Sequence, residues 1–136
     1  MRAALDTNIF LSAMLSARGA PASIVDAWRA KRFDLVTSLA QIEEFKRSVR
    51  YDRLRPYVTR SAAGRIVNEL RAAELVLKRL PSGMDTPDTG DAFLVATAIV
   101  SGADFLVTGD KTLLAMRRAG TTRVISARGF AAMLAR

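Results

Sequence analysis

Four acidic side chains stand where the sequence predicts that strands end or that helices begin. They are Asp6, Glu44, Asp91 and Asp110. The first and the last come just after short apolar runs typical of buried strands, and the other two lie near the start of expected helices. In an open parallel α/β sheet, the carboxyl ends of the strands and the N-termini of the following helices share one edge. All four carboxylates can therefore converge on one cleft.

Such a cluster favours metal chemistry, because converging carboxylates repel one another unless cations lie between them. A ligand set made only of oxygen suits Mg²⁺ or Mn²⁺. Such ions can activate a water and stabilise the negative charge of an attack at phosphorus. The chain has no His and no Cys. Ser-His-Asp arrangements and thiolate chemistry are thereby excluded, which leaves carboxylates, Lys, Tyr, hydroxyls or a metal held by oxygen.

The charge balance points to an anionic partner. The formal net charge is +8, with 21 Lys and Arg against 13 Asp and Glu, and residues 46–60 are especially basic. The planar guanidinium of Arg grips phosphate with two hydrogen bonds. The residues expected to contact RNA are Lys46, Arg47, Arg50 and Arg53, with Tyr51 and Tyr57 available for stacking. The alternative interpretations of this run are a solvated face, a surface for a small partner protein or a dimer surface.

Strands and helices are expected to alternate, which predicts βαβ units and a parallel sheet. Strands are predicted at Arg2–Leu5, Phe33–Ser38, Leu75–Leu77, Asp104–Thr108 and Arg123–Ile125. Helices are predicted at Ile9–Leu15, Pro21–Arg32, Leu39–Val49, Ser61–Ala73, Asp91–Ser101, Lys111–Arg118 and Ala127–Ala135. Ser38 is the expected N-cap of its helix, and Pro81–Gly90 reads as a loop. The length of 136 residues predicts a single domain over residues 1–136.

Four blocks of this sequence together resemble those of PIN-domain nucleases. The blocks are LDTNIF at Leu5–Phe10, SLAQIEEF at Ser38–Phe45, DAFLVATA at Asp91–Ala98 and ADFLVTGD at Ala103–Asp110. Their order and separation match over nearly the whole chain. More narrowly, they look like the VapC-like toxins of toxin–antitoxin pairs. Any one block alone would be a weak signal, and the set of four is specific.

The resemblance implies a three-layer α/β/α sandwich around a parallel sheet of four to five strands. It implies a Mg²⁺- or Mn²⁺-dependent endoribonuclease whose catalytic and metal-binding residues are Asp6, Glu44, Asp91 and Asp110. Asn8 and Thr108 fall where the family often has polar residues that support the metal site. A VapC-like member would form a homodimer, act as a toxin, and be blocked by a small antitoxin protein in its cleft.

Several alternatives stay open at this stage. Asp88 is a second candidate for the corner assigned to Asp91, and Glu43 is adjacent to Glu44, which is preferred because apolar Phe45 follows it. Each acid also has an ordinary structural interpretation. Asp6 and Asp110 would be helix N-caps. Asp91 would be an acid in the first turn of a helix, stabilised by the helix dipole. Glu44 would be a solvated residue that pairs with Lys46 or Arg47.

Competing functions are a non-catalytic PIN-like binding module and a phosphatase of the haloacid dehalogenase type. The phosphatase needs a second acid two residues after Asp6, where this chain has Asn8. Dinucleotide binding is disfavoured, because no G-x-G-x-x-G follows the first strand.

No apolar run reaches the roughly 18 residues of a membrane span, and the N-terminus is unlike a signal peptide. A cytoplasmic location without a membrane partner is expected.

Overall fold

A sheet of six strands forms the centre of the computed structural model, which describes residues 1–80 and 92–136. The strands are β1 (Arg2–Leu5), β2 (Asp34–Ser38), β3 (Leu75–Leu77), β4 (Phe105–Val107), β5 (Arg118–Ala119) and β6 (Thr122–Ile125). Their order across the sheet is β3-β2-β1-β4-β6-β5. All neighbouring pairs are parallel except β5 with β6, which is antiparallel. The predicted parallel α/β sheet is confirmed, except that its edge strand β5 is antiparallel.

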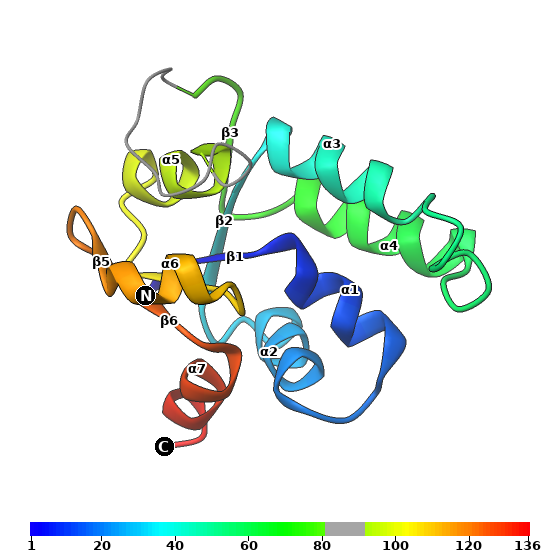
Figure 1. The fold of residues 1–136 in the computed structure, drawn as a ribbon, viewed down its shortest axis with the longest axis horizontal. Helices are drawn as coiled ribbons and strands as arrows, with labels where there is room; N and C mark the ends of the chain where they lie inside the picture. Colours follow the sequence, from blue (N-terminus) through cyan, green and yellow to red (C-terminus); the bar gives the residue numbers. More distant parts are fainter. Residues whose placement is uncertain (81–91) are drawn as a thin grey trace.

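Helices cover both faces of this sheet (Figure 1). The helices are α1 (Thr7–Leu15), α2 (Ala20–Arg29), α3 (Leu39–Ser48), α4 (Arg60–Arg71), α5 (Ala92–Val100), α6 (Lys111–Met116) and α7 (Ala127–Leu134). One core cluster joins the sheet to α1, α2, α3, α4 and α7, and the other joins it to α5 and α6. The chain is therefore a three-layer α/β/α sandwich. Among the described residues, no helix is long and apolar enough to cross a membrane.

The strands are apolar on both faces because side chains alternate along a strand and both faces are covered. In β1, Leu5 packs into the larger cluster and Ala4 into the smaller one. In β2, Leu35 packs into the larger cluster and Val36 into the smaller one. Each of these four side chains is at most 1% exposed. The central strands are thus held by both helical layers, which fixes where their carboxyl ends lie.

The predicted sheet of four to five strands is wrong in its count, because β5 was expected to be the end of a helix. The helix predicted over Lys111–Arg118 ends at Met116. Arg117 has φ 62°, in the left-handed region where an α-helix cannot continue. The chain then turns through Gly120, with φ 61°, so that β5 pairs with β6. This hairpin adds the sixth strand at the edge of the sheet.

Candidate active site

The candidate site lies where β1 and β4 end side by side. Leu5 is paired with Val107 in the parallel register of these two strands. The backbone N–H of Asp6 donates to the carbonyl of Val107 at 2.8 Å. Asp6 and Thr108 are therefore the first residues beyond two paired strand ends. This is the edge at which parallel α/β sheets present their ligands.

The hydroxyl of Thr108 connects the two aspartates of this edge. It donates to Oδ2 of Asp6 at 2.7 Å, and it accepts the backbone N–H of Asp110 at 3.0 Å. Thr108 is fully buried, whereas both aspartates are partly exposed. A buried hydroxyl with a donor role and an acceptor role fixes both partners relative to each other. Asp6 and Asp110, far apart in sequence, are thus brought to one place.

Both aspartates are also helix N-caps, as their structural interpretation predicts. Oδ1 of Asp6 accepts from the N–H of Asn8 at 3.3 Å, at the start of α1. Oδ1 of Asp110 accepts from the N–H groups of Thr112 and Leu113, at 2.8 and 3.1 Å, at the start of α6. The partial positive charge of a helix N-terminus stabilises a carboxylate placed there. In the part of the chain that the structure describes, no group donates to Oδ2 of Asp110.

The orientation of α3 brings Glu44 toward the same edge. Gln41 is 1% exposed, its Nε2 donates to the carbonyl of Leu5, and its Oε1 accepts from the hydroxyl of Thr37 at 2.6 Å. Glu44 follows three residues later on the same side of the helix. Because the carbonyl of Leu5 directly precedes Asp6, this side of α3 faces the end of β1. Oε2 of Glu44 is shielded from solvent.

Burial separates the two neighbouring glutamates of α3. The side chain of Glu43 is 58% exposed and pairs with Lys46 at 3.3 Å. Glu44 is only partly exposed. The ordinary role of a solvated glutamate paired with lysine is therefore filled by Glu43. The geometry favours Glu44 as the acid that α3 contributes to this edge.

The remaining predicted acids, Asp88 and Asp91, lie outside the described residues, so their roles stay predictions. The described helix that follows them, α5, is attached near the same edge through Thr97. The hydroxyl of Thr97 is fully buried, lies 2.9 Å from the hydroxyl of Ser38, and donates to the carbonyl of Phe93 at 2.6 Å. Ser38 is the N-cap of α3, as predicted, and accepts from the N–H of Gln41.

Sequence reasoning missed the positioning role of Gln41 and Thr97. A signal for Gln41 was present, since a polar residue stands next to Ile42 on the stripe that Phe45 also occupies. A buried polar side chain requires hydrogen-bond partners. Thr97 gave a weaker signal, because threonine is common in apolar helices and can bond to the carbonyl four residues before it.

The carboxylate oxygens of the described site residues are suitable ligands for a divalent metal ion. Mg²⁺ is typically bound by one or two carboxylates and keeps several waters. Asp6 and Asp110 supply two carboxylates; Thr108 bonds to the carboxylate of Asp6 and to the backbone of Asp110, and α3 carries Glu44. Within residues 1–80 and 92–136, no three His, Cys, Asp or Glu side chains are grouped closely enough to form a metal site. A third close carboxylate would have to come from outside those residues or from a movement of Glu44.

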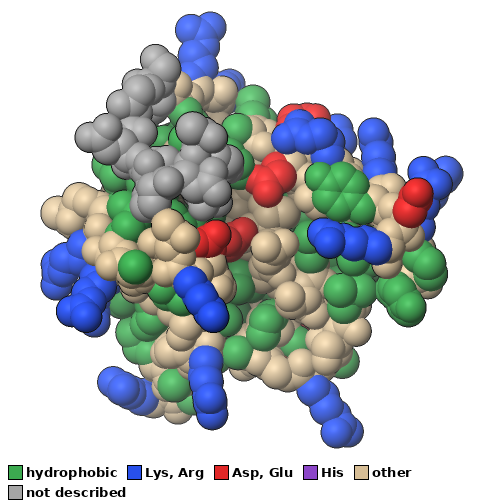
Figure 2. All heavy atoms as spheres, in the orientation of Figure 1, with side chains coloured by type: hydrophobic (Ala, Val, Ile, Leu, Met, Phe, Trp, Pro, Cys, Tyr) green, Lys and Arg blue, Asp and Glu red, His purple; other side chains and the backbone are tan. Residues whose placement is uncertain are grey.

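The predicted RNA-contacting residues lie on α3 and on the turn that follows it. Lys46 and Arg47 belong to the last turns of α3, and Arg53 lies 5.7 Å from the ring centre of Tyr51. Figure 2 shows acidic side chains near the centre of one face and Lys and Arg side chains around them, including over α3 and α4. The face combines a small acidic centre with a cationic surround.

Comparison with known proteins adds one match. A model of the PIN domain family matches residues 2–112. The matched region runs from β1 into α6 and contains both strand ends and the residues that follow them. Among curated proteins, none matches the chain.

Proposed function

The chain belongs to the PIN domain family, and from this membership we propose that it is a Mg²⁺- or Mn²⁺-dependent endoribonuclease. PIN domains are generally nucleases. The observation that carries the proposal is the hydrogen bond from Thr108 to Asp6, together with the bond from Asp110 to Thr108. These bonds hold the Asp6 carboxylate and the backbone of Asp110 at the edge where a parallel sheet binds its ligands.

In the proposed reaction, Asp6, Glu44, Asp91 and Asp110 hold the metal. The bound ion would supply an activated water and would stabilise the negative charge that develops at phosphorus. Thr108 keeps Oδ2 of Asp6 in place, and the N–H groups at the start of α6 keep Oδ1 of Asp110 in place. Carboxylates fixed in this way need little rearrangement during the reaction, which is how preorganised sites lower a barrier. Asn8 stands at the start of α1, beside Asp6, and would orient the substrate or a water.

The test is cleavage of single-stranded RNA in Mg²⁺ or Mn²⁺ by the wild type and by Asp6→Asn. Asparagine can still cap α1 through its one side-chain oxygen, and its amide can donate to the hydroxyl oxygen of Thr108, so this change removes the charge and keeps the cap. A matched control is Asp34→Asn, an exposed aspartate at the first residue of β2. We expect cleavage by the wild type and the control, and none by Asp6→Asn or in EDTA. Cleavage that persists in EDTA would refute the metal assignment.

The finer proposal is that the protein is the toxin of a VapBC-like pair, a cytoplasmic homodimer bound by a small antitoxin. The four sequence blocks that resemble VapC-like proteins support it. A neighbouring reading frame that encodes a small acidic or DNA-binding protein would support it further. Induced expression should arrest growth, and coexpression of that neighbour should relieve the arrest. Growth unaffected by the active protein would contradict the toxin role and leave the nuclease proposal intact.

A non-catalytic binding module is the second candidate, and one observation favours it. Both Asp6 and Asp110 are helix N-caps, a structural role that needs no metal. Calorimetry with Mn²⁺ at millimolar concentration distinguishes the candidates. Absence of any binding would favour the module, whereas binding that Asp6→Asn abolishes would favour the nuclease.

A further inference from the structure

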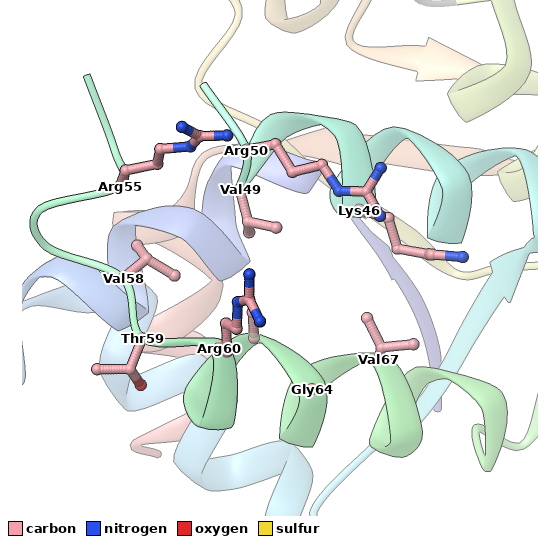
Figure 3. A pocket seen from close by; sticks show the side chains of 10 residues that line it. Lys46, Val49, Arg50, Arg55, Val58, Thr59, Arg60, Gly64 and Val67 are labelled. Carbon is pink, nitrogen blue, oxygen red and sulfur yellow. The ribbon is translucent and has the colours of Figure 1, made fainter. Parts of the chain in front are cut away.

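A pocket of about 660 Å³ lies between α3 and α4 (Figure 3), and its described lining residues include none of the acids of the candidate site. Four cationic side chains line it. Lys46 comes from the end of α3, Arg60 is the first residue of α4, and Arg50 and Arg55 come from the segment between these helices. In Figure 3, Arg60 extends from α4 into the space between the two helices. None of the described side chains that line this pocket is acidic.

The positive charge of this pocket is only partly compensated. Lys46 pairs with Glu43 at 3.3 Å, and Arg55 lies 3.8 Å from Asp52, which is fully exposed. Within residues 1–80 and 92–136, Arg50 and Arg60 form no ion pair. The N-terminus of α4 also opens here and adds partial positive charge. Cations gathered without acids indicate an anionic occupant.

The floor of the pocket is apolar and has spare room. Val49 and Val67 face each other across it from α3 and α4. Gly64, in the middle of α4, also lines it, and a Cβ built on Gly64 would meet nothing within 4 Å. Glycine inside a helix is less stable than alanine. Its presence leaves space for close approach of a ligand to the backbone of α4.

A cationic path leads from the acidic edge to this pocket. Residues three apart are neighbours on a helix surface, so Arg47 follows Glu44 along α3, and Arg50 lies in the turn just after the helix, where its N–H donates to the carbonyl of Arg47 at 3.1 Å. Arg47 and Arg50 are exposed. Lys46 lies about 200° around the helix from Glu44, with buried Phe45 between them. Because Arg50 also lines the pocket, this path runs from Glu44 to a pocket that lies on another side of α3.

We propose that this pocket binds a single-stranded segment of the RNA substrate next to the bond that is cut. Arg50 and Arg60 would bind phosphates, and a base or ribose would lie against Val49 and Val67. Three of the four cations are arginines, whose fork geometry suits phosphate. Tyr57, 71% exposed in the adjoining segment, offers a stacking surface. This inference rests on the proposed function, since it names how the same enzyme would hold its substrate.

An acidic, apolar segment of a partner protein would also satisfy a cationic rim and an apolar floor. The exposed tyrosines and the arginine path from the acidic edge favour RNA instead. The experiment therefore measures RNA affinity directly. It uses the Asp6→Asn protein, because cleavage would otherwise remove the labelled RNA during the measurement.

Fluorescence anisotropy of a labelled single strand of roughly 12 nucleotides gives the affinity over a range of salt concentrations. The pocket variant is Arg50→Gln with Arg60→Gln, and its control is Arg71→Gln with Arg128→Gln, two exposed arginines outside the pocket. We expect the pocket variant to weaken binding by at least about tenfold. The slope of the logarithm of the binding constant against the logarithm of the salt concentration should also become shallower by about 1.4, because each phosphate contact to a single strand contributes about 0.7 to that slope. The control should bind as the parent does.

A steric variant tests the pocket without changing charge. Gly64→Leu places a side chain in the space above α4, whereas Ala62→Leu adds the same side chain to α4 outside this pocket. We expect weaker RNA binding for the first and unchanged binding for the second. Thermal unfolding of both checks that the fold is kept.

The outcomes separate the two proposals. RNA affinity that is unchanged in the Arg50/Arg60 and Gly64 variants would overturn this inference and leave an acidic protein segment as the occupant of the pocket. Such a result leaves the nuclease proposal standing if the wild type still cleaves RNA. If the wild type cleaves no RNA, the nuclease proposal fails, and the anisotropy measurement still decides whether the pocket binds a single strand.

Discussion

The hydroxyl of Thr108 donates to Oδ2 of Asp6 at 2.7 Å, although 102 positions separate the two residues. This bond joins the ends of β4 and β1, and it leaves the hydroxyl oxygen of Thr108 to accept the N–H of Asp110. One buried side chain therefore bonds both to the carboxylate of Asp6 and to the backbone of Asp110. The sequence predicted Thr108 only as a supporting polar residue, and its link between the acids is a structural finding.

Replacing Thr108 with valine removes this link and keeps the shape of the side chain. One oxygen of Asp6 then loses its donor and the N–H of Asp110 loses its acceptor, which should lower the free energy of unfolding by about 1–3 kcal/mol. Chemical denaturation measures this change. Thr108→Ser keeps the hydroxyl and should recover most of the stability and the RNA cleavage. Equal cleavage by the valine and serine variants would show that the link has no functional role.

Asp6→Asn and Asp6→Ala separate capping from charge. Both remove the carboxylate, so both should lose Mg²⁺-dependent cleavage of RNA. Alanine also removes the N-cap of α1 and should cost about 1 kcal/mol in the free energy of unfolding, whereas asparagine caps nearly as well as aspartate. Denaturation and cleavage assays on the same preparations make the comparison. An Asp6→Asn protein that cleaves RNA normally would reduce Asp6 to its structural role.

Gln41→Leu tests whether α3 is positioned by its buried amide. The change leaves the carbonyl of Leu5 and the hydroxyl of Thr37 without their partner, and it should destabilise the fold by about 1–3 kcal/mol. It should also weaken Mn²⁺ binding, since α3 carries Glu44. The control is Leu39→Gln on the exposed side of α3, which should stay within about 0.5 kcal/mol of the wild type. Mn²⁺ affinity that is equal in both variants would contradict the positioning role.

The ion pair between Arg29 and Glu69 fastens α2 to α4 with two bonds of 2.8 Å. The hydrogen bond with Glu69 raises the pKa of Arg29 above its usual value. A raised pKa means that the stabilisation is fully present below the unfolded pKa and is lost only as the pH rises through the folded one. Arg29→Ala should therefore lower the free energy of unfolding by about 1 kcal/mol. The loss should be the same at pH 7 and at pH 10.

Denaturation of Arg29→Ala at these two pH values checks this expectation. Arg29→Lys should recover only part of the loss, because lysine cannot form the paired contact. The exposed Arg71 provides the control, since Arg71→Ala should leave the stability nearly unchanged. A loss that shrinks markedly between pH 7 and pH 10 would contradict the arginine as its source.

The sheet and the acidic edge could be predicted because their signals are local. Short apolar runs before Asp6 and Asp110 mark the strand ends, and parallel connectivity places these ends together. The turn at Arg117 could not be predicted, because nothing in its residue type demands a positive φ. Glu43 and Glu44 could not be separated from the sequence with certainty, since both stand at the edge of the buried stripe. Their burial depends on how α3 packs against the sheet.

The pocket between α3 and α4 marks another limit of the sequence. Its basic residues were visible as a charged run, but a run does not say which side chains share a cavity. Arg50 and Arg60 line the same pocket only because α3 and α4 pack side by side. Arg47 and Arg53, predicted to act with Arg50, do not line this pocket, and Arg55 and Arg60 do. Their contacts with RNA stay predictions.

Calorimetric titration of Mn²⁺ into the wild type, Asp6→Asn, Asp110→Asn and Asp34→Asn tests the central claim most directly. That claim is that the carboxylates of Asp6 and Asp110 bind the divalent ion on which RNA cleavage depends. We expect saturable binding to the wild type and to Asp34→Asn, and loss of binding in the other two. Equal Mn²⁺ binding by all four proteins, or none by the wild type, would contradict the account.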